Sequence, residues 1–184
     1  MSKDSTSSLY DSFAALLEYP SSDVKEHAVQ CLVQLQPTHP EAAETLEKFI
    51  RRLDQLSLDQ MRELYTTTFD MQPVCYPYVG YHLFGESYKR GAFMAQLNEA
   101  YHAIGYSAGQ ELPDHLTAIL RFLGLDSDNC SGEFCQTLLK EGVQPALEKM
   151  LKAFGDESEN PYFGLLSVLH LFLVRTSEME LSHA

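Results

Sequence analysis

The chain has 184 residues, of which 45% are hydrophobic, so it can bury a substantial core and is not globally disordered. It contains 26 acidic and 13 basic residues, a formal net charge of −13. Such a charge repels phosphate backbones and attracts cationic ligands, so we expect no nucleic-acid partner.

The N-terminal part of the chain has the periodicity of helices. A first helix is predicted over residues 8–18, ending before Pro20 because the residue that precedes a proline avoids the α region. A second helix is capped at residue 22 or 23 and is interrupted by the prolines of residues 37–40. Pro40 suits the first position of a third helix, which carries an apolar stripe as far as residue 53.

The next segment alternates helices with turns. Ser57 and Gln60 have the spacing of a capping box, which opens a fourth helix that ends near Phe69. Residues 70–77 contain two prolines and are predicted to be irregular, and a short helix is predicted over residues 78–84.

A long helix is predicted from its cap at Ser87 to residue 104, stopping at Gly105. After a loop over residues 106–112, Pro113 is predicted to start another helix whose first turn is capped by Asp114.

The C-terminal third is predicted to contain two helices, over about residues 130–141 and 143–154, then a flexible acidic connector and a last helix from Pro161. Strand-like alternation is nearly absent from the whole chain. We therefore predict an all-α fold, a single globular helical domain of roughly eight to ten helices over residues 1–184.

The cellular compartment is predicted from cysteines and from apolar runs. The four cysteines form no C-x-x-C pair and no disulfide framework, which favours a reducing compartment. The polar residues 1–8 do not resemble an export signal, and the longest apolar run, residues 162–174, is too short for a bilayer. These features predict a cytoplasmic protein with no stable membrane insertion.

Catalytic and metal-binding interpretations were weighed for the polar residues around position 115. Asp114 could orient His115 for catalysis or metal binding, but no further ligands follow at a typical spacing, and a helix cap explains Asp114 equally well. Ser87 is not in a nucleophile elbow, and Cys75 has no evident base beside it. We therefore predict that the protein is not an enzyme and uses no metal or other cofactor.

Aromatic residues are concentrated between positions 76 and 93. Those of helices are expected to pack inward, but those of a proline-rich loop cannot all be buried without leaving backbone groups unpaired. A groove lined by Tyr and Phe and edged by Glu86, Glu111 and Asp114 suits a peptide with apolar residues and a basic head.

Four short motifs follow one another along the chain: LLEYP at residues 16–20, YTTTFD at 65–70, GESYKRG at 85–91 and ELPDHL at 111–116, the last followed by Leu120, Phe122 and Leu123. Together they resemble the nitrate reductase delta-subunit family of redox-enzyme maturation chaperones (the NarJ/TorD/DmsD group), closest to its NarJ-like branch. Each motif alone is weak, but the ordered set over residues 9–125 is specific.

The resemblance implies an all-helical cytoplasmic chaperone. Members bind the N-terminal signal or signal-like segment of a molybdopterin-containing oxidoreductase catalytic subunit until its molybdenum cofactor is inserted, before assembly or twin-arginine export. The Pro-Asp-His box and the loop before the Gly-Glu-Ser turn help to form the peptide site, and members occur as monomers or as domain-swapped dimers. The candidate peptide-binding residues are Tyr76, Tyr78, Tyr81, Leu83, Phe84, Glu86, Glu111, Pro113, Asp114 and His115.

Two rival hypotheses remain open on the sequence alone. The first is a small metal-dependent hydrolase that uses Asp114, His115 and Glu86, with His82 or His102. The second is an assembly subunit that stays bound to the mature enzyme.

Overall fold

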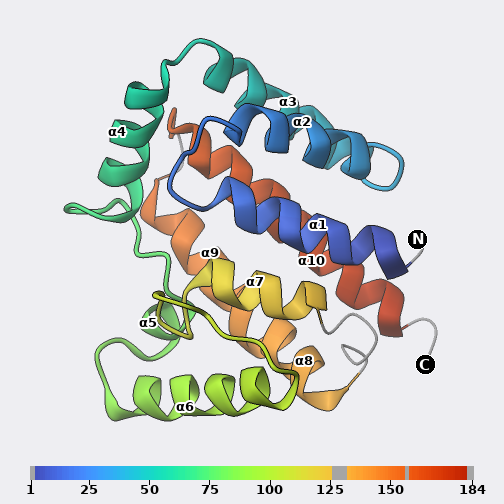
Figure 1. Cartoon of the computed structure of the whole chain (residues 1–184), viewed down its shortest axis with the longest axis vertical. Coiled ribbons are helices and arrows are strands. Elements are labelled where there is room, and N and C mark those ends of the chain that lie inside the picture. Colours follow the sequence, from blue (N-terminus) through green and yellow to red (C-terminus); the bar gives the residue numbers. More distant parts are fainter. Residues whose placement is uncertain (1–2, 126–131, 156–157, 182–184) are drawn as a thin grey trace.

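Helices make up almost all of the regular structure in residues 3–125, 132–155 and 158–181, which are the residues that the computed structural model describes (Figure 1). The all-α prediction is confirmed, and strand pairing in these ranges is limited to one isolated bridge between Tyr78 and His115. The elements are α1 (Lys3–Leu16), α2 (Val24–Leu35), α3 (Pro40–Asp54), α4 (Leu58–Phe69), α5 (Val79–Phe84), α6 (Tyr88–Ala103), α7 (Leu116–Leu125), α8 (Glu133–Thr137), the π-helical turn η1 (Leu138–Val143), α9 (Gln144–Ala153) and α10 (Pro161–Leu181).

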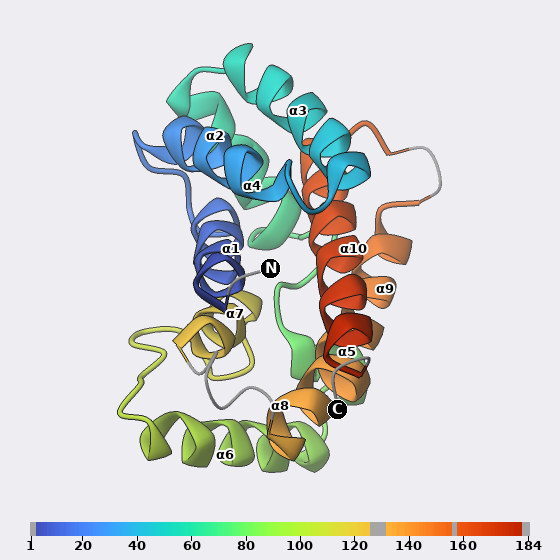
Figure 2. The ribbon, with the colours of Figure 1, turned by 90° about the vertical axis from the view of Figure 1, so that its right-hand side faces the viewer.

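The core is built around α10, which packs against α3 and α9, while α1 packs against α2 and α7. Figure 2 shows α1 and α7 on one side of the molecule, α10 and α9 on the other, and α6 below both. The two sides meet through aromatic rings: the centroid of Phe172 lies 5.3 Å from that of Tyr10 and 5.4 Å from that of Phe13. Burial of such large rings is a main source of folding free energy.

Several predicted helix starts are confirmed by their hydrogen bonds. Pro40 is the first residue of α3. In the capping box of α4, the Gln60 N–H donates to Ser57 Oγ (3.3 Å) and the Ser57 N–H donates to Gln60 Oε1 (2.9 Å). At the start of α10, Asn160 Oδ1 accepts from the Tyr162 N–H at 3.0 Å. These bonds satisfy N–H groups that have no partner inside the helix.

Two predicted boundaries and one predicted capping bond are wrong. The first helix begins at Lys3, about a turn earlier than predicted, because its first turn carries almost no apolar signal. Ser87 occupies the cap position of α6 but its side chain makes no capping bond. The helix expected from Pro113 begins only at Leu116, because the preceding residues pair with the 77–79 segment instead.

The helices predicted over 130–141 and 143–154 form one continuous helical run from α8 to α9. The break expected at Gly142 is absent because η1 accommodates that residue in a π-helical turn, where it is buried. A Cβ at Gly142 would lie 3.3 Å from Leu138 Cδ1, so there is little space for a side chain at this position of the turn. The predicted start at Cys130 and residues 156–157 of the predicted connector lie outside the described residues.

Helix α6 forms one edge of the molecule and is only lightly packed. Leu97 and Tyr101 are its only fully buried residues, and it packs against the short helix α5. Gly85 joins α5 to α6 with φ +61°, in the left-handed region that favours glycine. From this turn α6 runs beside the Pro-Asp-His box, to which Arg90 and Tyr101 donate hydrogen bonds.

Candidate functional site

Two segments that are far apart in the sequence are joined by backbone hydrogen bonds at the predicted site. The Val79 N–H donates to the Asp114 carbonyl oxygen and the Leu116 N–H donates to the Pro77 carbonyl oxygen, each at 2.8 Å. The Tyr101 hydroxyl donates to the Pro113 carbonyl oxygen at 2.8 Å and holds the same segment from α6. The proline-rich loop and the Pro-Asp-His box therefore form one local structure.

Asp114 is fully buried and is bound by Arg90 of α6. Arg90 Nε donates to Oδ2 at 2.7 Å and Nη2 donates to Oδ1 at 3.3 Å, while the two side chains are 17% and 0% exposed. The Arg90 guanidinium also lies 5.2 Å from the Tyr78 ring centroid and 5.9 Å from that of Tyr81. These hydrogen bonds to Asp114 raise the pKa of Arg90.

Gly80 is required beneath this ion pair. A Cβ there would lie 2.7 Å from Asp114 Oδ2, closer than side-chain atoms tolerate. The prediction that Asp114 caps the helix is therefore wrong. Its carboxylate accepts hydrogen bonds from Arg90 instead. We infer that it positions the loop, because both of its oxygens are occupied and none of its surface is open to solvent.

A pocket of about 500 Å³ opens beside the Tyr78–His115 bridge. We name it the acidic pocket. Its walls come from the segment that follows α1, from α4 and the residue after it, from the proline-rich loop, from the 111–115 segment and from the start of α7. The lining residues are Glu18, Tyr19, Tyr65, Phe69, Asp70, Pro77, Tyr78, Glu111, His115 and Thr117.

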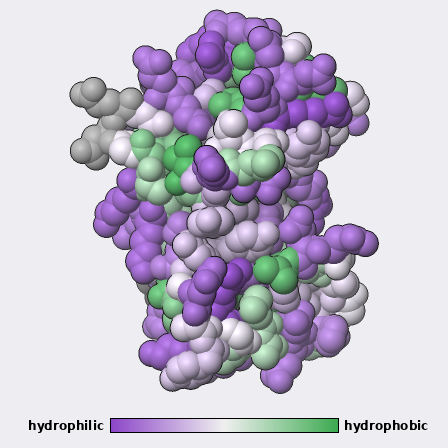
Figure 3. All heavy atoms as spheres, turned by 90° about the vertical axis from the view of Figure 1, so that its left-hand side faces the viewer, coloured by the Kyte–Doolittle hydropathy of each residue, from purple (hydrophilic) through white to green (hydrophobic). Residues whose placement is uncertain are grey.

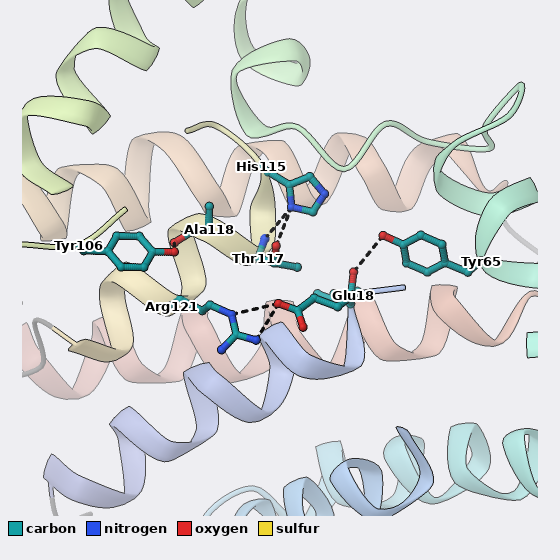
Figure 4. Close-up of polar contacts among 8 residues, drawn as sticks. Glu18, Tyr65, Tyr106, His115, Thr117, Ala118 and Arg121 are labelled. Atoms are coloured by element: carbon teal, nitrogen blue, oxygen red, sulfur yellow. Dashed lines mark hydrogen bonds and ion pairs between the residues drawn. The ribbon is translucent and has the colours of Figure 1, made fainter. Parts of the chain in front are cut away.

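The carboxylates of the acidic pocket differ in their partners. Glu18 is held by Arg121 of α7, whose Nη2 and Nε lie 2.6 and 3.0 Å from Oε1 (Figure 4). Asp70 and Glu111 are exposed, and no cation of the described residues pairs with either. The pocket therefore holds negative charge that the described part of the chain does not neutralise.

Tyrosines line the same pocket and respond to its charge. Burial, followed by the charge of Glu111, raises the pKa of both Tyr65 and Tyr78 above the ordinary value. The Tyr65 hydroxyl donates to the Leu17 carbonyl oxygen at 3.4 Å, which orients the ring (Figure 4). Neutral aromatic faces beside unpaired carboxylates form an environment suited to a guanidinium or ammonium group.

His115 lies in the pocket wall and is 4% exposed. Its ring stands edge-on to Tyr78, with centroids 5.2 Å apart, and its Nδ1 lies 2.7 Å from Thr117 Oγ1. Burial lowers the pKa of His115, while the charges of Glu111, Asp114 and Glu18 act in the opposite direction.

The remaining predicted residues lie around the turn from the loop to α6. The Tyr76 and Tyr81 rings contact each other with centroids 4.6 Å apart, and Tyr76 is 41% exposed. Leu83 and Phe84 line a second depression, of about 790 Å³, and Glu86 is exposed at the turn. This apolar groove is lined by Leu83, Phe84, Phe93, Gln96, Glu99, Ala100, Glu133, Phe134, Thr137, Leu138, Glu141 and Gly142.

The ten predicted residues thus divide into groups. Tyr78, Glu111 and His115 line the acidic pocket, and Pro113 and Asp114 support it from behind. The other five follow the chain away from the pocket: Tyr76, Tyr81, Leu83, Phe84 and Glu86. Figure 3, which views the molecule from the side of α4 and α5, shows hydrophobic residues in separate patches among hydrophilic ones.

Sequence reasoning did not assign Glu18, Tyr19, Tyr65, Phe69 or Asp70 to the site. All five belong to motifs that carried the family resemblance, LLEYP and YTTTFD, so the signal was present in the sequence. The fold brings these five residues into the same pocket as Glu111 and His115.

The geometry does not support the hydrolase hypothesis. Both oxygens of Asp114 bind Arg90 and His115 Nδ1 contacts Thr117, so the two do not form a carboxylate–imidazole pair. Burial raises the pKa of Cys75 to about 12, which suppresses its thiolate. In the described ranges, no group of three or more His, Cys, Asp or Glu side chains is arranged to hold a metal ion.

A sequence profile described as "Nitrate reductase delta subunit" matches residues 34–167, more than two thirds of the chain. No curated protein matches the sequence. Among solved structures, the fold is similar to "Crystal Structure Of A Putative Redox Enzyme Maturation Protein From Archaeoglobus Fulgidus", with 21% identity, a TM-score of 0.62, and coverage of 91% of this chain and 93% of the other. None of the helices in the described residues is both long enough and apolar enough to span a bilayer.

Proposed function

The chain belongs to the nitrate reductase delta subunit family, and we propose that it binds the N-terminal signal or signal-like segment of a molybdopterin oxidoreductase catalytic subunit. The family consists of redox-enzyme maturation chaperones, which are not catalytic and which bind molybdoenzyme catalytic subunits. The proposal adds the part of the client that is bound, the surface that binds it, and the cytoplasm as the place of binding.

The observation that carries the proposal is the unneutralised charge of the acidic pocket. Asp70 and Glu111 lie beside the rings of Tyr19, Tyr65 and Tyr78, and a leader peptide begins with a basic head. Arg90 provides an internal precedent nearby, because this chain holds its guanidinium with one carboxylate and two tyrosine faces. An arginine of the leader would find the same chemical groups in the pocket.

The apolar run of the leader has a surface of its own. Tyr78 borders the acidic pocket, and Leu83 and Phe84 border the apolar groove. The connecting helix α5 has six residues, a rise of about 9 Å. An extended peptide covers about 3.3 Å per residue, so a few residues lead from one site to the other. The exposed aromatic ring of Tyr76 lies on the loop before α5 and contacts Tyr81 of that helix.

Binding would be reversible, as a chaperone requires. Exposed charge pairs contribute about 0.2–1 kcal/mol each, and a disordered leader loses conformational entropy when it is ordered. We expect affinity in the micromolar to submicromolar range. The client would be held in the cytoplasm while its molybdenum cofactor is inserted and would then be released for assembly or twin-arginine export.

The first test is affinity capture from the native cytoplasm with mass spectrometry of the bound proteins. We expect a molybdopterin oxidoreductase catalytic subunit that a synthetic peptide of its own N-terminus displaces. Capture of no such subunit, under conditions where one is expressed, would contradict the proposal. If the chain were found instead in the mature, exported enzyme, a permanent assembly subunit would replace the chaperone.

The second test asks whether the peptide binds in the acidic pocket. The double variant Asp70→Asn/Glu111→Gln is compared with Glu26→Gln/Glu44→Gln, which removes the same charge from exposed positions on α2 and α3. Loss of two exposed charge contacts costs about 0.4–2 kcal/mol, so we expect roughly twofold to thirtyfold weaker peptide binding for the pocket variant only. Equal binding by both variants would place the leader elsewhere.

A further inference from the structure

The hydrogen bonds of His115 determine which ring nitrogen carries the proton. The backbone N–H of Thr117 donates to His115 Nδ1 at 3.3 Å, and the Thr117 hydroxyl lies 2.7 Å from the same nitrogen. A backbone N–H can only donate, so Nδ1 must present its lone pair. The neutral ring therefore carries its proton on Nε2.

The Nε2–H group is the hydrogen-bond donor of the neutral ring. Across the described ranges, no residue accepts a hydrogen bond from His115 Nε2. Figure 4 shows this nitrogen on the side of the ring away from Thr117, toward Tyr65, which lines the same pocket. Nε2 is not among the fully buried polar atoms without a partner, so it is open to the pocket, and a ligand acceptor would replace the water that this N–H binds in the free chain.

The charge of the pocket selects the kind of acceptor. Glu18, Asp70 and Glu111 line the same space, so a carboxylate or phosphate ligand would be repelled. A neutral carbonyl oxygen is the acceptor that such a pocket tolerates. Backbone carbonyls accompany every residue of a peptide, including the residues beside a leader arginine.

We propose that His115 is a specificity-determining residue that donates Nε2–H to a backbone carbonyl oxygen of the bound leader peptide. The inference rests on the proposed function and deepens it: the carboxylates recognise the cation of the leader, and His115 recognises its backbone. The pocket then distinguishes a peptide arginine from a free cation of the same charge.

A consequence is that protonation of His115 opposes binding. The imidazolium would carry a proton on Nδ1, against the Thr117 N–H, and would place a positive charge beside the cation of the leader. Burial favours the neutral ring, since it lowers the pKa of His115. Charged or titratable groups surround the ring on every side. The acids and tyrosines are Glu18 after α1, Tyr65 of α4, Asp70 after α4, Tyr78 of the loop, and Glu111 and Asp114 of the box. The cations are Arg90 of α6 and Arg121 of α7, which bind Asp114 and Glu18.

The first arm of the test is nitrogen-15 NMR of the imidazole rings in the free chain at pH 7.5. We expect His115 to show the Nε2–H tautomer with an unprotonated Nδ1. An Nδ1–H tautomer or an imidazolium would overturn the inference. This arm needs no peptide, so its outcome is independent of the proposed function.

The second arm measures leader-peptide affinity for His115→Met, His115→Gln and the exposed control His102→Gln. The Met variant keeps the bulk but loses the donor, and we expect about fivefold to tenfold weaker binding. The Gln variant keeps a neutral donor, so it should bind within about threefold of the unmodified chain and lose the fall in affinity from pH 7 to 5.5. His102→Gln should change neither property.

The outcomes separate the two claims. Failure of the unmodified chain to bind any leader peptide would contradict the proposed function, whatever the tautomer. Binding of the peptide by His115→Met as tightly as by the unmodified chain would overturn only the role of His115. Persistence of the pH dependence in His115→Gln would assign it to another group.

Discussion

Replacement of Arg90 by methionine tests whether the ion pair with Asp114 holds the site together. The change keeps most of the side-chain volume but leaves the Asp114 carboxylate, 0% exposed, without a cation. Breaking a buried pair in this way costs about 3–5 kcal/mol. For a domain of this length each kcal/mol corresponds to about 2–4 °C, so the melting temperature should fall by about 6–20 °C.

The second variant of this experiment is Asp114→Asn, made alone and combined with Arg90→Met. The amide removes the buried charge, so the double variant should be more stable than Arg90→Met alone, although it carries one more substitution. Urea and thermal unfolding followed by circular dichroism measure the four free energies of a double-mutant cycle. If the two substitutions were additive, or if Arg90→Met cost less than about 1 kcal/mol, the reasoning about Asp114 would be refuted.

Two further predictions concern residues near this pair and the buried thiols. Gly80→Ala should destabilise the chain by about 1–3 kcal/mol, because its Cβ would lie 2.7 Å from Asp114 Oδ2. The control Gly91→Ala, on the exposed face of α6, has open space around its Cβ and should stabilise the chain by about 0.5–1 kcal/mol. Urea unfolding measures both free energies, and equal effects would contradict the close contact at Gly80. Cys31 and Cys75 are buried and burial raises the pKa of each to about 12, so a thiol reagent should modify them in the unfolded chain only, and rapid labelling of either under native conditions, read by mass spectrometry, would show that the structure around that thiol opens.

The fold was predictable to a large extent because helix signals are local. Pro40 at the start of α3 and the capping box at Ser57 act within a few residues, and both occur where the sequence indicated. The start of α7 was predicted wrongly because a non-local contact determines it. Pro113 favours a first helical position, but the backbone of the box pairs with residues 77–79, and that tertiary contact outweighs the local preference.

The site was predictable only in part, because a pocket is made of contacts between distant segments. The Pro-Asp-His box was identified from its motif, and Tyr78 from the concentration of aromatic residues between positions 76 and 93. Nothing in the sequence indicated that Arg90 would neutralise Asp114, or that Glu111 and Asp70 would face the same space. Periodicity gives the face of a helix that is buried, but not which helix covers it.

The ion pair between Glu18 and Arg121 has a consequence for the order of synthesis. It joins residues that are 103 positions apart, and α1 and α7 lie against each other along the same contact. At about 5–20 residues per second, the ribosome needs on the order of 5–20 s to add Arg121 after Glu18. The acidic pocket cannot form completely before then, so a growing chain lacks the proposed peptide site. A chain released by premature termination before α7 would never acquire it.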